Sequence, residues 1–183
     1  MKIAVFIDGG NLYRRLKEIN IKSTSRFDYA GFVNFVANNN PPGYIGYYIG
    51  QIKYDEGDQK TMQLYANQQK LFKYLENSIP SIKIIRGHIQ KFGKIYKEKG
   101  VDVKLALDIY RLANKDIYDK AIVISSDGDL VPAIELVQNE NKKSVEYIGF
   151  RGKASFALMK ECKSTRLLTY DNIKQFESKP DLS

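Results

Sequence analysis

The sequence predicts a three-layer α/β/α fold built on a mainly parallel β-sheet of about five to six strands. Short apolar runs alternate along the chain with longer stretches in which apolar residues recur at helical spacing. Strands that alternate with helices are typical of a parallel sheet with right-handed crossovers and helices on both faces. The chain has 183 residues, 43% of them hydrophobic, which suffices for one domain at residues 1–177 with a frayed tail at 178–183.

The first predicted strand covers residues 2–7 and ends at Asp8. Its apolar run is too short for a helix before the glycine pair at 9–10, which permits a tight turn and close backbone approach. A helix over residues 11–19 follows, because its apolar residues share one face. Asn11 can orient a ligand or cap this helix, and the two roles are compatible.

The middle of the chain continues the alternation of helices and strands. We expect helices at 28–36, 58–77 and 101–113, and strands at 44–52 and 81–86. Asp28 is expected to act as the N-cap of the first of these helices. Three tyrosines on the strand at 44–52 invite a base-stacking interpretation, but core packing is favoured because aromatic residues are ordinary in strands. They are Tyr44, Tyr47 and Tyr48.

Residues 87–100 lack a helical stripe and are expected to form a loop or hairpin. Lysines there are interleaved with aromatic residues, which suits a surface that binds a single nucleic-acid strand. A solvated hairpin is the alternative, and His88 is expected to be incidental. The basic residues assigned to substrate binding are Arg86, Lys91, Lys94, Lys97 and Lys99, joined by Arg151 and Lys153 from a later basic loop.

The last third of the chain carries the strongest chemical signal. A strand at 120–124 runs into Ser125 and then into two carboxylates one residue apart, Asp127 and Asp129. Ligands of open α/β sheets bind outside the carboxyl ends of the strands, so these acids are well placed for chemistry. A helix follows them, and we expect a strand at 144–148, a short helix at 155–160 and a last edge strand at 167–170.

Separated acids can meet at the sheet if the strands that end at Asp8 and Ile124 are neighbours. Asp8, Asp127, Asp129 and Asp102 of the helix at 101–113 would then share one crevice. Such acids repel one another and raise some carboxyl pKa values unless a cation neutralises them. Mg²⁺ or Mn²⁺ prefers oxygen ligands, activates water and stabilises charge on a phosphodiester. Asn11 and Ser125 would orient ligands or phosphate.

Asp108 is secondary to the four acids and its role stays open, whereas the single cysteine is expected to be structural. Asp108 lies about 120° around the helix axis from Asp102, so it is expected to pair with Lys104 or Arg111. Cys162 has no partner for a disulfide or a zinc cluster and is expected to be a buried, inert thiol.

Composition narrows the class of partner. A net charge of +8 and a pI near 9.3 favour an anionic partner, with solubility alone as the weaker interpretation. The N-terminal apolar run is too short for a signal peptide, and no run approaches the roughly 20 residues that span a bilayer. We therefore expect a cytoplasmic protein. Its oligomeric state stays open, with a homodimer as one option.

Three segments together resemble the signature segments of the NYN domain, in the LabA-like branch of the PIN-like nuclease superfamily. They are FIDGGN at 6–11, KGVDVKLALD at 99–108 and VISSDGDLVP at 123–132, and the likeness covers about residues 2 to 150. The resemblance implies a PIN-like, Rossmann-like fold and, in many members, metal-dependent ribonuclease activity. The residues that match the family motifs are Asp8, Asn11, Asp102, Asp108, Ser125, Asp127 and Asp129.

The match has two departures. Leu130 stands where a phenylalanine is usual, and Ser126 stands where glycine is common. Both are compatible with the predicted metal site.

The hypothesis that follows is a divalent-metal-dependent endoribonuclease that acts on single-stranded RNA. A second hypothesis is a catalytically silent nucleic-acid-binding or regulatory module, because some family members are thought to act in this way. A third is a phosphatase or nucleotide hydrolase, which would form a phospho-aspartate. The sequence has no G-x-x-x-x-G-K-[ST] phosphate loop, which disfavours a P-loop NTPase.

Overall fold

A seven-stranded sheet forms the middle layer of the protein, in the strand order β4-β3-β2-β1-β5-β6-β7. The computed structural model describes residues 1–21, 27–54, 56–92 and 95–177, except for the side chains of 88–99. Every neighbouring pair of strands is parallel except β3 and β4. The strands are β1 (Ile3–Asp8), β2 (Tyr44–Gly50), β3 (Ile82–Phe92), β4 (Ile95–Lys99), β5 (Lys120–Ile124), β6 (Ser144–Phe150) and β7 (Ser164–Leu168).

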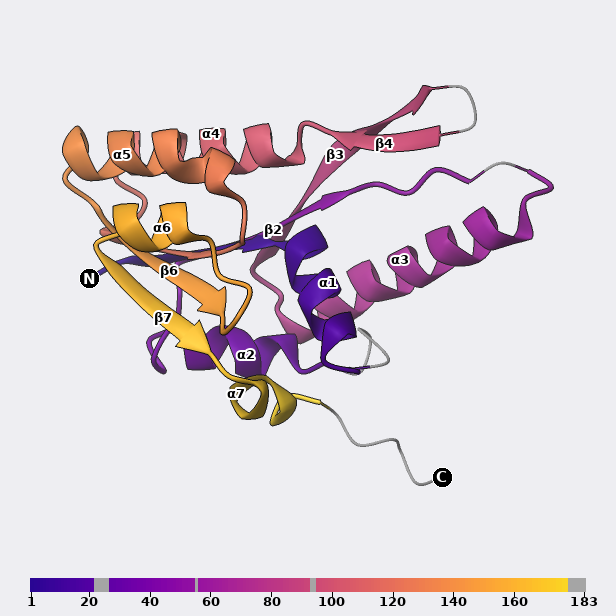
Figure 1. Ribbon diagram of the computed structural model, residues 1–183, viewed down its shortest axis with the longest axis horizontal. Coiled ribbons are helices and arrows are strands. Elements are labelled where there is room, and N and C mark those ends of the chain that lie inside the picture. Colours follow the sequence, from indigo (N-terminus) through magenta and orange to yellow (C-terminus); the bar gives the residue numbers. More distant parts are fainter. Residues whose placement is uncertain (22–26, 55, 93–94, 178–183) are drawn as a thin grey trace.

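Helices cover both faces of this sheet, which confirms the predicted three-layer α/β/α class (Figure 1). One face carries α1 (Gly9–Glu18), α2 (Tyr29–Val36), α3 (Gln59–Ser78) and α7 (Tyr170–Lys174). The other carries α4 (Val101–Asn114), α5 (Val131–Asn139) and α6 (Phe156–Glu161). No helix in the described part of the chain is both long and apolar enough to cross a membrane.

Strand β1 is the centre of the structure. All six of its residues are buried, and the five apolar ones alternate between the two cores. Val5 and Ile7 pack under α1 and α2, whereas Ala4 and Phe6 pack under α4 and α5, as the two-residue period of a strand requires. The chain leaves β1 outward through β2 and β3, then returns to β5 on its other side. The carboxyl ends of β1 and β5 therefore flank the topological switch point, where such sheets bind ligands.

The local predictions for the middle of the chain are confirmed. Asp28 is the N-cap of α2, since Oδ1 of its side chain accepts a hydrogen bond of 2.9 Å from the backbone N–H of Gly31. Within residues 87–100, the described part of β3 pairs antiparallel with β4, as a hairpin requires. The three tyrosines of β2 are buried in the cores, so they are not available to stack on bases.

The C-terminal region differs from the prediction by one element. The last strand is β7, which begins at Ser164 instead of residue 167, and residues 170–174 form α7. A capping box explains the end of the strand. The side chain of Thr169 accepts from the N–H of Asn172, and the side chain of Asn172 accepts from the N–H of Thr169. This reciprocal cap starts a helix.

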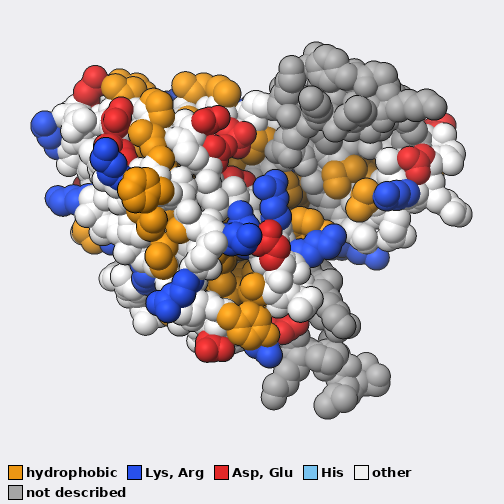
Figure 2. Space-filling view, viewed as in Figure 1, with side chains coloured by type: hydrophobic (Ala, Val, Ile, Leu, Met, Phe, Trp, Pro, Cys, Tyr) orange, Lys and Arg blue, Asp and Glu red, His pale blue; other side chains and the backbone are white. Residues whose placement is uncertain are grey.

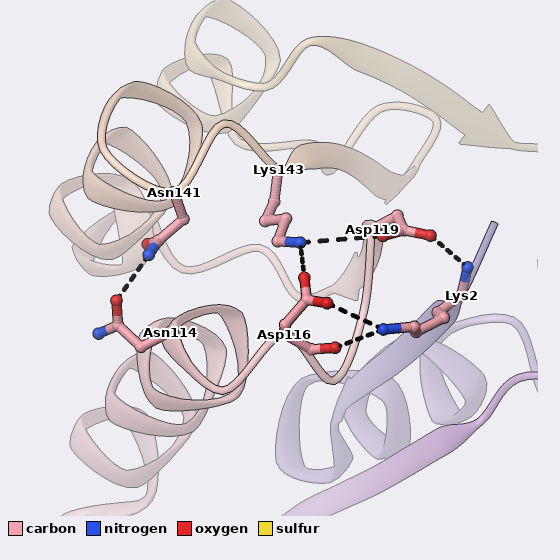
Figure 3. A network of polar contacts seen from close by, with 6 residues as sticks. All are labelled: Lys2, Asn114, Asp116, Asp119, Asn141 and Lys143. Carbon is pink, nitrogen blue, oxygen red and sulfur yellow. Dashed lines mark hydrogen bonds and ion pairs between the residues drawn. The ribbon is translucent and has the colours of Figure 1, made fainter.

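Charged side chains at the amino ends of β1, β5 and β6 form ion pairs with one another (Figure 3). The Lys2 side chain donates to Asp116 Oδ2 at 3.0 Å, and its backbone N–H donates to Asp119 at 2.6 Å. Lys143 forms an ion pair with Asp116. The hydrogen bonds from Lys143 and Lys2 lower the pKa of Asp116 to about 2. The acids at this end of the sheet are thus balanced by cations.

The start of α1 depends on a glycine. A Cβ atom on Gly9 would lie 2.5 to 2.9 Å from the ring and hydroxyl of Tyr47, which is fully buried. We expect Gly9→Ala to lower the free energy of unfolding by about 1–3 kcal/mol, because the packed ring has no room to move. Denaturant titration would measure the change. Gly10→Ala is the matched control: its Cβ would meet only Asp8 at 3.6 Å, so an equal loss would contradict this explanation.

Candidate active site

Asp8 is a buried carboxylate at the carboxyl end of β1, with 6% of its surface exposed. Oδ1 accepts a hydrogen bond of 2.9 Å from the N–H of Asn11, so Asp8 also caps α1. Oδ2 accepts one of 2.8 Å from the hydroxyl of Ser125, at the end of β5. Burial raises the pKa of Asp8, the hydrogen bonds from Asn11 and Ser125 oppose this, and the charge of Asp127 adds to it.

A chain of hydrogen bonds continues from Asp8 into the turn after β5. Ser125 is 1% exposed, and its hydroxyl also accepts a bond of 3.1 Å from the N–H of Asp127. Asp127 in turn caps the 3₁₀ turn η2 (Gly128–Leu130), because its Oδ1 accepts a bond of 2.9 Å from the N–H of Asp129. Ser125 therefore links the acid of β1 to the acid pair that follows β5.

Asp102 approaches the same crevice from the first turn of α4. Its side chain lies at an exposed rim, and partial loss of hydration raises its pKa. The negative charges of Asp8, Asp127 and Asp129 raise that pKa further. The four acids predicted from the sequence therefore lie close enough at the switch point for their charges to act on one another. Figure 2 shows acidic side chains gathered where α4 and α5 begin, with basic side chains beside them over α1.

The oxygen atoms at this site are of the kind that hard divalent cations prefer as ligands. Asp8 supplies a carboxylate whose charge is costly to bury, and Oδ1 of Asn11 is buried without a hydrogen-bond partner in the described part of the protein. In the described residues, no three acidic, histidine or cysteine side chains already stand close enough to hold one ion. Asp102 and Asp129 are exposed, so binding an ion requires their side chains to turn inward.

Two polar side chains near the acids were not assigned a role from the sequence. Nε of Arg15 is buried without a hydrogen-bond partner among the described residues, while Nη1 of the same guanidinium donates to Glu18 at 2.7 Å. The hydroxyl of Ser126 is also buried and interacts with the hydroxyl of Tyr147. Ser126 directly precedes Asp127, and Arg15 lies one turn after Asn11 on α1. Both can donate to an anion. The only sequence signals were the serine in place of a usual glycine and the cation on the first helix.

Asp108 has the structural role that its helix position predicts. Arg111 donates to its Oδ1 at 2.8 Å, and the hydroxyl of Tyr48 donates to its Oδ2 at 3.0 Å. The thiol of Cys162 is also structural as expected: it is buried, and desolvation raises its pKa to about 12.

Three of the basic residues predicted to hold substrate are described, on β3 and after β6. Arg86 of β3 is exposed, and its guanidinium stacks over the ring of Phe72 at 4.7 Å. Arg151 and Lys153 are exposed after the carboxyl end of β6. The hairpin lysines lie outside the described side chains, so their prediction stays untested: they are Lys91, Lys94, Lys97 and Lys99.

The fold and its acidic switch point define a class of α/β proteins with carboxylates at the carboxyl end of a parallel sheet. The family model of the NYN domain matches residues 2–168, and the chain belongs to this family. The NYN domain is part of the PIN-like nuclease superfamily, which generally uses divalent metals. The predicted PIN-like fold is therefore confirmed.

A solved structure has the same fold. It is the crystal structure of a protein of unknown function from Vibrio parahaemolyticus, with a TM-score of 0.62 and 22% sequence identity. The match covers 91% of this chain and 92% of that chain. No curated protein matches the sequence. At this identity the likeness shows the fold alone.

The acids of the crevice should lower the stability of the protein. The pKa of Asp102 is higher in the folded protein than in the unfolded chain. The contribution of Asp102 to the free energy of unfolding is therefore most favourable below the ordinary carboxyl pKa, and it is lost as pH rises through the raised pKa of the folded protein. We therefore expect Asp102→Asn to raise the melting temperature in EDTA at neutral pH, with a gain that shrinks toward about pH 4. Thermal scans at several pH values would measure this.

Asp116→Asn is the matched control for that experiment, because the pKa of Asp116 is lowered instead of raised. Its stabilising contribution is present above the ordinary carboxyl pKa and is lost as pH falls through about 2. Asp116→Asn should therefore lower the melting temperature at neutral pH. A loss of stability in both variants would show that Asp102 is not under electrostatic strain.

Proposed function

We propose that this protein is a divalent-metal-dependent endoribonuclease that hydrolyses phosphodiester bonds of single-stranded RNA. The observation that carries the proposal is the group of four aspartates that includes buried Asp8, at the switch point of a NYN domain. The excess of positive charge over the whole chain supports a polyanionic substrate. Acids that repel one another need a counter-charge, and a divalent cation supplies it.

Mg²⁺ or Mn²⁺ would be held by the four aspartates, with Oδ1 of Asn11 as a further oxygen ligand. Such a cation, when bound, lowers the pKa of a water and stabilises negative charge on the phosphate. The protein itself holds the acids in place. Ser125 holds Asp8 and the backbone of Asp127 through one hydroxyl. That shared contact fixes the spacing between the carboxyl ends of β1 and β5.

Two further donors would bind the substrate strand. Ser126 offers a buried O–H group, and Arg15 offers a buried Nε–H group while its Nη1 pairs with Glu18, which suits a phosphate next to the one that is cleaved. Arg86 and the pair Arg151 and Lys153 would hold the backbone on either side. The hairpin lysines would extend this surface: Lys91, Lys94, Lys97 and Lys99.

One observation favours a second function. Among the described residues, no three acidic, histidine or cysteine side chains stand close enough together to hold one ion. A catalytically silent module that binds RNA would need only the basic surface. It would bind RNA with a strong dependence on salt and show no turnover in Mn²⁺ or Mg²⁺.

Asp127→Asn separates the two functions. We expect it to lower metal-stimulated cleavage of single-stranded RNA by at least about 100-fold, because it removes a carboxylate from the proposed ion site while an amide oxygen can still cap η2. Wild-type activity should vanish in EDTA and return with Mn²⁺. Fluorescence of a doubly labelled RNA would report cleavage, and circular dichroism would report folding.

Asp116→Asn is the control for this test, since Asp116 is an exposed aspartate at the opposite end of the sheet. It should retain wild-type cleavage. If Asp127→Asn and the wild type degrade RNA equally, the site is misassigned. If neither cleaves RNA but both bind it, the silent module is the correct function.

A further inference from the structure

The segment that runs from the end of β6 into α6 exposes two cations and, a few residues later, an aromatic ring. Phe156, the first residue of α6, is 75% exposed. Arg151 and Lys153 of the same loop are also exposed, and residues 151–160 contain no acid. Cations next to an accessible aromatic face are the features that bind a single nucleic-acid strand without reading its sequence.

This loop packs directly against the proposed catalytic turn. A Cβ atom on Gly128, which lies between Asp127 and Asp129, would be 3.8 Å from Oγ of Ser155 and 3.7 Å from Cβ of Ala157. Ser155 and Ala157 are the two neighbours of Phe156 in the chain. In Figure 2 an exposed hydrophobic surface lies over the beginning of α6, close to the acidic side chains at the start of α5.

The backbone on both sides of Phe156 is fixed by hydrogen bonds. The N–H of Ser155 donates to the hydroxyl of Tyr147 at 3.0 Å, and the side chain of Ser155 caps α6. The N–H of Lys153 donates to the carbonyl of Phe150 at 2.9 Å, which closes the turn. The backbone that carries the Phe156 ring is therefore held in place before a ligand binds, so less conformational freedom is lost on binding.

We propose that Phe156 is a stacking platform for one unpaired base of the RNA, next to the phosphate that is cleaved, while Arg151 and Lys153 hold the adjoining phosphates. This inference rests on the proposed function and defines its substrate class. A base in a duplex is stacked on its neighbours and paired with the opposite strand, so its faces are not free to lie on the ring. The platform therefore selects single strands.

The test measures binding without cleavage. A short single-stranded RNA that carries the fluorescent base 2-aminopurine would be titrated with the wild type and with Phe156 variants in EDTA. Phe156→Ala should raise Kd by about 5- to 150-fold, the loss that follows from one missing base stack. Phe156→Tyr should retain binding and the change in 2-aminopurine fluorescence. Phe156→Leu, which is apolar but has no ring, should behave like Phe156→Ala.

Two controls complete the experiment. Tyr170→Ala removes another exposed aromatic residue, on α7 at the opposite face of the sheet, and should leave Kd unchanged. Binding of the same sequence as a duplex should not depend on Phe156. Equal binding by the wild type and Phe156→Ala would overturn the proposal, as would full retention by Phe156→Leu. A change in oligomeric state with unchanged RNA binding would also overturn it, because the ring would then serve self-association.

This outcome is independent of the test of catalysis. A loss of binding in Phe156→Ala together with no cleavage by the wild type would reject the nuclease and keep the base platform. Cleavage that depends on Asp127 but not on Phe156 would keep the nuclease and reject the platform.

Discussion

The buried carboxylate of Asp8 connects the parts on which this structure depends. One of its oxygens accepts from the N–H of Asn11 and starts α1, and the other accepts from Ser125 and ties β1 to β5. The same group therefore ends the central strand, begins the first helix and faces the switch point. Its charge is costly in this position, since burial raises its pKa and only part of that cost is offset by hydrogen bonds.

The environment of acidic side chains differs between the two ends of the sheet, and it shifts their pKa values in opposite directions. At the amino end, Lys2 and Lys143 pair with Asp116, whose pKa they lower. At the carboxyl end, Asp8 and Asp102 have raised pKa values. A chain under selection for stability alone would replace such acids, so their presence points to a function that needs charge there. A bound cation would neutralise the repulsion between the carboxylates, and the free energy gained in this way would favour binding of the cation.

The positions of the acids could be predicted because strand ends can be read from the sequence, and parallel topology then places Asp8 beside the turn of Asp127. Burial of individual polar atoms could not be predicted. Ser126 and Arg15 became candidates only when tertiary packing showed the Ser126 hydroxyl and Nε of Arg15 to be buried. The exposure of Phe156 was equally hidden, since the sequence predicts a short helix without its orientation. Strand β7 was placed too late because pairing with β6 extends it through polar residues, which carry no apolar signal.

The central claim is that the aspartates at the switch point form a divalent cation site. A crystal structure of the protein soaked in Mn²⁺, with anomalous scattering recorded, tests it most directly. The account predicts an anomalous peak between Asp8 and Asp127, at a carboxylate oxygen distance close to the roughly 2.0–2.1 Å typical of Mg²⁺ sites. No peak in this crevice at saturating Mn²⁺, or peaks only at other acids such as Asp116, would contradict it.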